Sequence, residues 1–407
     1  PGFELLTFAS ESFSEQKMHI GQYIFAQLTA FLPQRQFRRI AKKYMDQTFN
    51  WNPSPWSHLL ALMYGQLAGC GSLRELTDIL AAHAKRSYSL GFGARPINRT
   101  SLSRVNSYRD YHIFEDFAFY MINIAQGKRI TKDFELHGRF YAVDSTTIDL
   151  CMSMFNWAHF RSTKSGIKVH TQIDIATEIP VFYRITNAKL HDSHFMDMLT
   201  YEPSACYVFD RGYFDLSRMF SISQTGAFFI IREKGKPTYE IVDGSDFLEG
   251  DDGILRDQTI RFTGKRNKGN YPSNLRRVVY YAKELKRSFT YYTNNFYLKA
   301  KDIALLYRYR WQVELFFKWI KQHLKVKTFW GTSENFVRIQ IHVAIITYCL
   351  IAIVEHDLKI GRPVVEVMRI LGNSLLVKDS INELFQPFKM EYEDGDDGQL
   401  CIDFKFN

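Results

Sequence analysis

Residues 307–321 read YRYRWQVELFFKWIK, and this helix-like segment carries a single acid, Glu314, among four basic side chains. At about 100° of rotation per residue, five side chains share a stripe roughly 80° wide. An apolar back on the far side is formed by Val313, Phe316, Trp319 and Ile320. The stripe contains Tyr307, Arg310, Glu314, Lys318 and Lys321. Salt bridges between residues four apart explain Glu314 but not Tyr307 or Lys321. A catalytic carboxylate among phosphate-binding cations explains the whole stripe.

Two further acids follow apolar, strand-like runs. Asp144 ends the run FYAVD and Asp210 ends CYVFD, and acids at strand ends project from a sheet edge, where α/β sites commonly form. Each aspartate alone could equally be a helix cap. Together with Glu314 they supply hard oxygen ligands for two Mg²⁺ ions, with Mn²⁺ as a substitute. Two such ions, about 3.5–4 Å apart, suit in-line attack on a phosphodiester.

These residues resemble the DDE transposases of bacterial insertion sequences, specifically the IS-four family. The third acid of that family lies in a Y-x2-R-x3-E-x6-K signature, which is matched at every spacing by Tyr307, Arg310, Glu314 and Lys321. The other matching motifs are DST (144–146), FDRGY (209–213), GIKVH (166–170) and NAKLHDS (187–193). The resemblance covers about 138–354, and residues 18–127 match an N-terminal domain of one branch more loosely.

The resemblance implies a ribonuclease-H-like catalytic fold with a β-strand insertion between the second acid and the glutamate. It implies that Asp144, Asp210 and Glu314 bind the metal ions, while the cations of the stripe bind phosphates of the element end. Related enzymes stack a flipped base on a tryptophan of the insertion, but 233–298 contains no tryptophan. The aromatic residues that could substitute are Tyr239, Phe247, Phe262 and Tyr271.

Hydrophobic periodicity predicts the elements that must position these residues. Segment 20–127 repeats apolar residues at steps of three and four, which is typical of helices, and Ser72 with Glu75 forms a capping box. Five β-prone runs over 138–232 begin as a closely spaced antiparallel meander and then alternate with helices.

Two helices are expected after the insertion, at 300–324 and 337–354. The apolar run 339–354 has 16 residues and includes polar side chains, so it is short for a membrane span and fits a buried core helix.

We therefore predict an α/β protein with a ribonuclease-H-like mixed sheet and a β-rich insertion, preceded by an all-α DNA-binding domain. Met18 is a candidate native start. The expected divisions are an N-terminal tail (1–17), the helical domain (18–130), the first part of the catalytic core (131–232), the insertion (233–298), the second part of the core (299–370) and a C-terminal tail (371–407).

The charge balance favours an anionic partner. The chain of 407 residues has a formal net charge of +9, and residues 261–287 hold nine Lys and Arg against one acid, where a solvated face would normally mix signs. A short segment, 98–111, also exposes basic residues that could read a major groove or simply face solvent. Besides the stripe, the candidate DNA contacts are Arg261, Lys265, Arg266, Lys268, Arg276, Arg277, Arg99, Arg104 and Arg109.

Weaker candidates surround the three acids. A strand neighbouring that of Asp144 alternates Lys168, His170, Gln172 and Asp174, which could line the site or face solvent. The side chains of His191, Asp192 and His194 have metal-ligand types, but such a cluster is more often a loop and helix cap. Asp149 could be an accessory acid but fits a surface position better.

The predicted function is a DNA transposase that binds terminal inverted repeats, cleaves the element ends and joins the 3′-OH ends to target DNA. We expect a homodimer on double-stranded DNA and no membrane association. Five cysteines without a C-x-x-C pair fit a reducing cytosol, so we expect a cytoplasmic, nucleoid-associated bacterial protein. The alternatives are a structure-specific nuclease of the same fold and a non-catalytic DNA-binding protein derived from a transposase.

Overall fold

The computed structural model describes residues 21–45, 52–128, 136–151, 154–161, 164–235, 237–246, 253–323 and 329–386. Residues 1–17, Phe247 and most of the C-terminal tail lie outside these ranges.

In the described residues before the first strand the structure has six α-helices, in the segment where the periodicity predicts helices. They are α1 (Ile24–Ala30), α2 (Gln34–Tyr44), α3 (Pro55–Leu67), α4 (Leu73–Ala82), α5 (Arg99–Tyr108) and α6 (His112–Lys128). The predicted capping box starts α4: the Ser72 hydroxyl accepts a hydrogen bond from the Glu75 backbone N–H at 3.1 Å. The Glu75 carboxylate accepts from Gly71 N–H rather than from Ser72, so the box is shifted by one residue on this side.

The central strands confirm a meander followed by alternation with helices. They are β1 (Phe140–Leu150), β2 (His159–Arg161), β3 (Lys164–Asp174), β4 (Pro180–Asn187), β5 (Cys206–Phe209) and β6 (Phe228–Arg232). Strand β3 lies antiparallel between β1 and β4, whereas β5 runs parallel to both β1 and β6. The connections contain η3 (Asp192–Met198), η4 (Arg211–Tyr213) and α7 (Leu216–Gln224).

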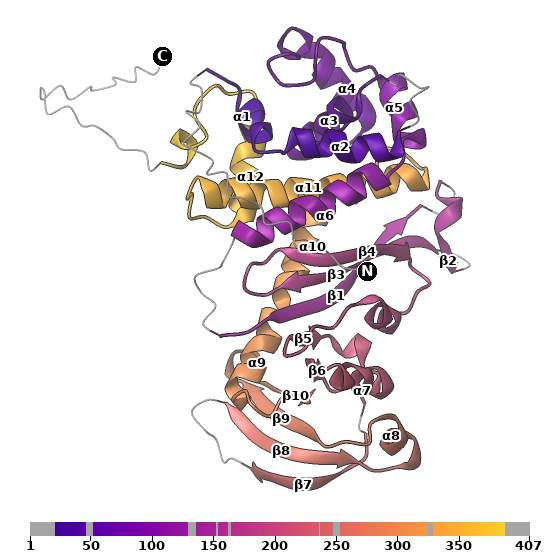
Figure 1. The fold of residues 1–407 in the computed structure, drawn as a ribbon, viewed down its shortest axis with the longest axis vertical. Coiled ribbons are helices and arrows are strands. Elements are labelled where there is room, and N and C mark those ends of the chain that lie inside the picture. The colour runs from indigo at the N-terminus through magenta and orange to yellow at the C-terminus, as the bar shows by residue number, and fades with distance from the viewer. Residues whose placement is uncertain are drawn as a thin grey trace, which may run out of the picture.

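The β-prone runs after residue 233 extend this same sheet. They form β7 (Tyr239–Asp246), β8 (Ile254–Phe262), β9 (Leu275–Ala282) and β10 (Arg287–Thr293), with α8 (Lys265–Asn270) between β8 and β9. Because β10 pairs antiparallel with β6, the strand order is β2-β3-β1-β5-β6-β10-β9-β8-β7, with β4 on β3. Figure 1 shows β7 and β8 at the end of the molecule opposite the helical layer.

The predicted helix over 300–324 is wrong in one respect, because it is two helices, α9 (Ala300–Tyr309) and α10 (Trp311–His323). At the junction the Val313 N–H bonds to the carbonyl of Arg310, three residues back, which is tighter than the α-helical pattern. The predicted apolar back of α10 is confirmed, since its members are buried: Val313, Phe316, Trp319 and Ile320.

The apolar run near 340 forms α11 (Glu334–Asp357), followed by α12 (Val364–Asn373). Helix α11 is long and apolar enough to span a membrane, yet 94% of its most apolar window is buried inside the protein. It packs against α6, α3, α5 and α12. The N-terminal and C-terminal helices therefore share one hydrophobic core, and Figure 1 shows them as one layer across the end of the sheet.

The sheet carries a core on each face, which decides where neighbouring residues of β1 point. Ala142 belongs to the core shared with the helical layer and α10, whereas Val143 belongs to a second core with Phe195 and Phe209. Because side chains alternate along a strand, Asp144 points to the face of α10 and Ser145 to the face of the second core.

The remaining short 3₁₀ turns are η1 (Ala84–Arg86), η2 (Asn156–Ala158), η5 (Lys283–Leu285) and η6 (Glu383–Phe385).

Candidate active site

The two aspartates lie side by side because their strands pair in parallel. Val143 of β1 is in register with Phe209 of β5, so the residues that follow, Asp144 and Asp210, are neighbours. Asp210 lies directly after β5, as predicted. The expectation that Asp144 ends its strand is wrong, because β1 continues to pair with β3 as far as Leu150. Asp144 nevertheless lies at the point where β5 stops and the sheet opens on that side.

Arg310 joins the first acid to the third. Its Nη1 donates to Asp144 Oδ2 at 2.7 Å, and its Nη2 donates to Glu314 Oε1 at 2.6 Å. The intrahelical Arg310–Glu314 bridge considered above is therefore present, but the same guanidinium also reaches β1. The break between α9 and α10 falls at this residue, and only 9% of Arg310 is exposed.

Tyr307 reaches the second acid from the last turn of α9. Its hydroxyl donates to Asp210 Oδ1 at 3.4 Å, a long contact, while Asp210 Oδ2 accepts from the Gly212 N–H at 3.2 Å. Burial raises the pKa of Tyr307 to about 12, so the hydroxyl stays protonated and remains a donor. The tyrosine, arginine and glutamate of the signature thus converge with both aspartates.

Negative charge is concentrated at this point of the sheet. Burial raises the pKa of Asp144 from 3.8 to about 6, with the charges of Asp210 and Glu314 adding to the rise and Arg310 opposing it. Burial alone would lower the pKa of Arg310, but the charge of Asp144 and the hydrogen bond to Glu314 raise it overall. The acids therefore favour a permanent cation between them.

The residue types fit a hard divalent cation, because carboxylate oxygens are its usual ligands. Asp144 and Glu314 both bond to Arg310, whereas Asp210 bonds to Tyr307 and the Gly212 N–H. As the side chains lie, no three His, Cys, Asp or Glu side chains in the described part of the chain are close enough to hold a metal ion. The Arg310 guanidinium lies between Asp144 and Glu314, where such a cation would be placed. Metal binding by the trio thus requires Arg310 to move.

The last residue of the signature has a role that the helical wheel did not predict. Lys321 Nζ donates to the backbone carbonyl of Thr147 in β1 at 2.8 Å, which ties α10 to the strand that carries Asp144. The wheel explained Lys321 only as a phosphate-binding cation, because it describes one helix and not the strand on which that helix packs. Lys318, one turn from Glu314, is exposed.

The polar row of β3 neither lines this site nor faces solvent. His170 and Gln172 are buried under η3, and burial lowers the pKa of His170 to about 4. Lys168 bonds to Asp192, whose carboxylate also accepts from Ser145, so these residues meet on the face opposite Asp144. Burial alone would raise the pKa of Asp192, but the hydrogen bonds from Ser145 and Lys168 lower it overall.

The sequence pattern indicates Asp192 only as part of a loop and helix cap and does not single out Ser145, although the motifs NAKLHDS and DST contain these two residues. The cap interpretation is confirmed for His191, whose ring accepts from the Ser193 N–H at the start of η3. Asp149 is exposed, as expected for a surface residue.

Part of the predicted DNA surface on α5 is corrected by burial. Arg109 is buried and donates to the Pro53 carbonyl at 2.7 Å, and the buried Asn106 bonds to His58. Neither side chain is available to a DNA groove, because α5 packs on α11 through this side. Arg99 and Arg104 are exposed.

The basic residues of the insertion also include both buried and exposed side chains. Arg276 and Arg277 lie on β9, between β8 and β10, and both are buried. Arg276 forms an ion pair with Asp257 at 2.7 Å, and Arg277 bonds to Gln258, so the prediction that they contact DNA is wrong for this arrangement. The exposed members are Arg261, Lys265 and Lys268, and the side chain of Arg266 lies outside the described residues.

Burial also limits which aromatic residues of the insertion could stack on a flipped base in place of tryptophan. Phe262 and Tyr271 are each 1% exposed, so neither can stack on a nucleobase without unpacking the second core. Tyr239 is half-buried beneath the Arg277 guanidinium, and it alone of the three has free surface.

Comparisons with known proteins agree with the sequence motifs. The family described as "Transposase DDE domain" matches residues 135–350, and a domain of unknown function (DUF4372) matches residues 20–93. A protein of Sinorhizobium fredii, provisionally named as a transposase, is 32% identical over 60% of this chain and 69% of its own.

Two insertion-sequence proteins and one solved structure are also similar. The transposase named for an insertion sequence of Geobacillus stearothermophilus is 30% identical over 51% of this chain and 55% of its own. One from Synechocystis is 22% identical over 69% of this chain and 79% of its own. A piggyBac transposase synaptic complex with hairpin DNA aligns with 89% of this chain and 82% of its own, at 9% identity and a TM-score of 0.43, too low to support a structural argument.

Proposed function

Because the chain belongs to the transposase DDE domain family, whose members cleave and join DNA with divalent metal ions, we propose that it transposes a bacterial insertion sequence. It binds the terminal inverted repeats of the element, cleaves the element ends and joins the 3′-OH ends to target DNA. Its similarity to insertion-sequence transposases agrees with the IS-four resemblance of its motifs.

The observation that carries this proposal is the convergence of Asp144, Asp210 and Glu314 from three separate elements. Glu314 lies on α10, 170 positions after Asp144 in the sequence. A structural salt bridge needs one acid, whereas phosphodiester chemistry needs several carboxylates on one site. The meander β1-β3-β4 followed by the parallel β5 and β6 supports a ribonuclease-H-like catalytic core.

Asp144, Asp210 and Glu314 would hold Mg²⁺, with Mn²⁺ as a substitute. When bound, the ions supply the positive charge that activates the attacking oxygen and stabilises the leaving oxygen. The protein orients two of these carboxylates through backbone donors, the Ser145 N–H on Asp144 and the Gly212 N–H on Asp210, while Arg310 holds Glu314 in the metal-free protein.

The basic residues of the stripe would position the DNA. Once released from Asp144 and Glu314, the planar guanidinium of Arg310 would grip a phosphate of the element end. Tyr307 is held next to it by Asp210 and can donate to the same phosphate group. Lys318 is exposed and reaches phosphates directly, whereas Lys321 first has to release the Thr147 carbonyl.

Two separate surfaces would bind the remaining DNA. Arg99 and Arg104 lie on α5 in the helical layer, and the insertion presents Arg261, Lys265 and Lys268. A transposase must hold two element ends, so we propose a homodimer on DNA, in the cytoplasm and in contact with the nucleoid.

The test removes one carboxylate charge at a time while keeping the side-chain shape. Asp144→Asn, Asp210→Asn and Glu314→Gln should each reduce cleavage of inverted-repeat DNA by more than about 100-fold, since even outer partners of metal ligands cost 10–100-fold. Binding of the ends in a gel-shift assay should persist. A variant that cleaves at the wild-type rate excludes its residue as a metal ligand.

The same assay separates the alternatives. A structure-specific nuclease would cleave the ends without forming a strand-transfer product, and a non-catalytic DNA-binding protein would do neither. Chelator should abolish both reactions, and either Mg²⁺ or Mn²⁺ should restore them.

A further inference from the structure

Asp192 is connected to the first catalytic acid through one residue. The Ser145 hydroxyl donates to Asp192 Oδ1 at 2.6 Å, while the Ser145 N–H donates to Asp144 Oδ1 at 2.8 Å. Ser145 and Asp144 point to opposite faces of β1, so Asp192 contacts β1 on the face opposite Asp144. The hydroxyl that bonds to Asp192 and the N–H that bonds to Asp144 belong to the same residue, Ser145.

Lys168 anchors Asp192 to the neighbouring strand. Its Nζ donates to Asp192 Oδ1 at 3.0 Å and to the Leu190 carbonyl at 2.8 Å. Only 14% of the Lys168 side chain is exposed, so this bond is shielded from water and is stronger than a surface ion pair. The carboxylate thus joins β1, β3 and the start of η3.

Asp192 also approaches the segment of the second catalytic acid. A Cβ atom built on Gly212 would lie 3.6 Å from Asp210 Oδ2 and 4.0 Å from Asp192 Oδ2. Gly212 supplies the N–H that bonds to Asp210, so both carboxylates lie close to this residue. A side chain at position 212 would touch both of them.

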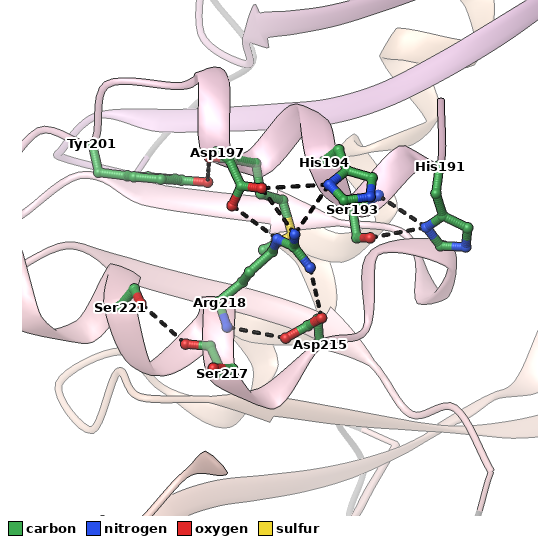
Figure 2. Close-up of polar contacts among 10 residues, drawn as sticks. His191, Ser193, His194, Asp197, Tyr201, Asp215, Ser217, Arg218 and Ser221 are labelled. Carbon is green, nitrogen blue, oxygen red and sulfur yellow. Dashed lines mark hydrogen bonds and ion pairs between the residues drawn. The ribbon is translucent and has the colours of Figure 1, made fainter. Parts of the chain in front are cut away.

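A second clamp fixes the other end of η3, as Figure 2 shows. Arg218 of α7 donates to both oxygens of Asp197 at 2.8 Å and to Asp215 at 2.8 Å. Helix α7 begins shortly after Asp210, and η3 begins at Asp192. The clamp therefore holds the segment of Asp192 to the segment of Asp210.

We propose that Asp192 is a positioning residue of the active site, which sets the orientation of Asp144 and its separation from Asp210, and with them the affinity for divalent metal. This rests on the proposed function, because it takes Asp144 and Asp210 as the metal ligands. Asp192 Oδ1 accepts from Ser145 and Lys168, so in this role Asp192 acts through Ser145 and is not itself a metal ligand.

The experiment measures Mn²⁺ binding to the full chain by isothermal titration calorimetry, without DNA. Asp192→Ala should weaken Mn²⁺ binding about tenfold, as loss of an outer partner of a metal ligand does. Ser145→Ala should weaken it in the same direction, because it removes the hydroxyl and keeps the N–H on Asp144. Asp192→Asn keeps an acceptor for Ser145 and should fall between wild type and Asp192→Ala.

Glu366→Ala is the matched control. Glu366 pairs with Arg362 at 2.6 Å on α12, far from the site, so its loss should leave the Mn²⁺ affinity unchanged. Melting temperature and gel-shift binding of element ends are recorded for every variant. A purely structural role would lower the melting temperature and leave the affinity of the folded protein unchanged.

Wild-type Mn²⁺ affinity in folded Asp192→Ala and Ser145→Ala overturns the positioning role and leaves the proposed function standing. If Asp192→Ala does not fold, Ser145→Ala decides alone. An Asp144→Asn variant that binds Mn²⁺ as tightly as wild type, or a wild type that binds none, overturns the assignment of the metal ligands and the positioning role with it.

Discussion

Two buried arginines, Arg276 and Arg310, show how a structural ion pair differs from the proposed metal site. Arg276 of the insertion faces one carboxylate, Asp257, and two backbone carbonyls, those of Asn295 and Leu298. Arg310 faces two carboxylates from different elements, and its Nε is buried without a hydrogen bond.

The difference lies in the charge balance. At Arg276 the positive charge of the guanidinium is balanced by the negative charge of Asp257, so we interpret this ion pair as a structural part of the insertion. At Arg310 the acids outnumber the cation, and the pKa of Asp144 rises to about 6 because burial and the neighbouring acids disfavour its charge. An excess of negative charge around one exchangeable cation is what a metal site requires, and the following predictions test this contrast.

The largest effect is expected on stability at Arg276. Arg276→Ala leaves Asp257 without its cation in a mostly buried place, which should cost about 3 kcal/mol of unfolding free energy. Arg310→Ala should cost less, about 1 kcal/mol, because Asp144 can take up a proton instead. Urea unfolding at neutral pH measures both, and equal losses would show that the two sites do not differ in this way.

The affinity for Mn²⁺ should change in Arg310→Ala and not in Arg276→Ala, which reverses the order expected for stability. Arg310→Ala removes the group that competes for the carboxylates, so Mn²⁺ should bind about tenfold more tightly, which corresponds to about 1.4 kcal/mol. Arg276→Ala should bind Mn²⁺ as wild type does. Calorimetry checks this, and weaker binding by Arg310→Ala would mean that the guanidinium organises the acids rather than replacing a metal ion.

The pH dependence of stability should carry the signature of Asp144. A carboxyl whose pKa rises on folding from 3.8 to about 6 binds more protons in the folded protein, so its contribution is largest at low pH and is lost as pH rises through about 6. Between pH 5 and pH 7 the metal-free wild type should lose about 1 kcal/mol relative to Asp144→Asn. Thermal or urea unfolding of both proteins in chelator measures the difference, and parallel curves would contradict the raised pKa.

The smallest contrast concerns the two lysines of α10. Lys321→Ala removes the bond to the Thr147 carbonyl and should cost about 1 kcal/mol, whereas the exposed Lys318→Ala should cost under about 0.5 kcal/mol. If Lys318 contacts a phosphate, its loss should flatten the salt dependence of end binding by about one contact. If the two variants behaved identically in both assays, the distinction between Lys321 as a structural residue and Lys318 as a phosphate contact would be wrong.

The shared core limits how the regions can be separated. Helix α6 packs along α11, so deleting the N-terminal helices would expose the apolar surface of α11 instead of leaving an intact catalytic fragment. Point variants of Arg99 and Arg104 are therefore the better test of DNA recognition by the helical layer.

The sequence alone determined the types of the elements and the three acids that we propose as catalytic. Helical and strand periods depend on neighbours two to four residues apart, which any stretch of chain displays, and the spacing of Tyr307, Arg310, Glu314 and Lys321 is a local property of the same kind. Only the tertiary structure decided which basic residues face solvent, where the helix breaks and which residues Asp192 contacts. Arg310 meets Asp144 across 166 positions and Lys321 meets Thr147 across 174. Burial and pairing at such separations depend on what packs alongside, and no local pattern contains that information.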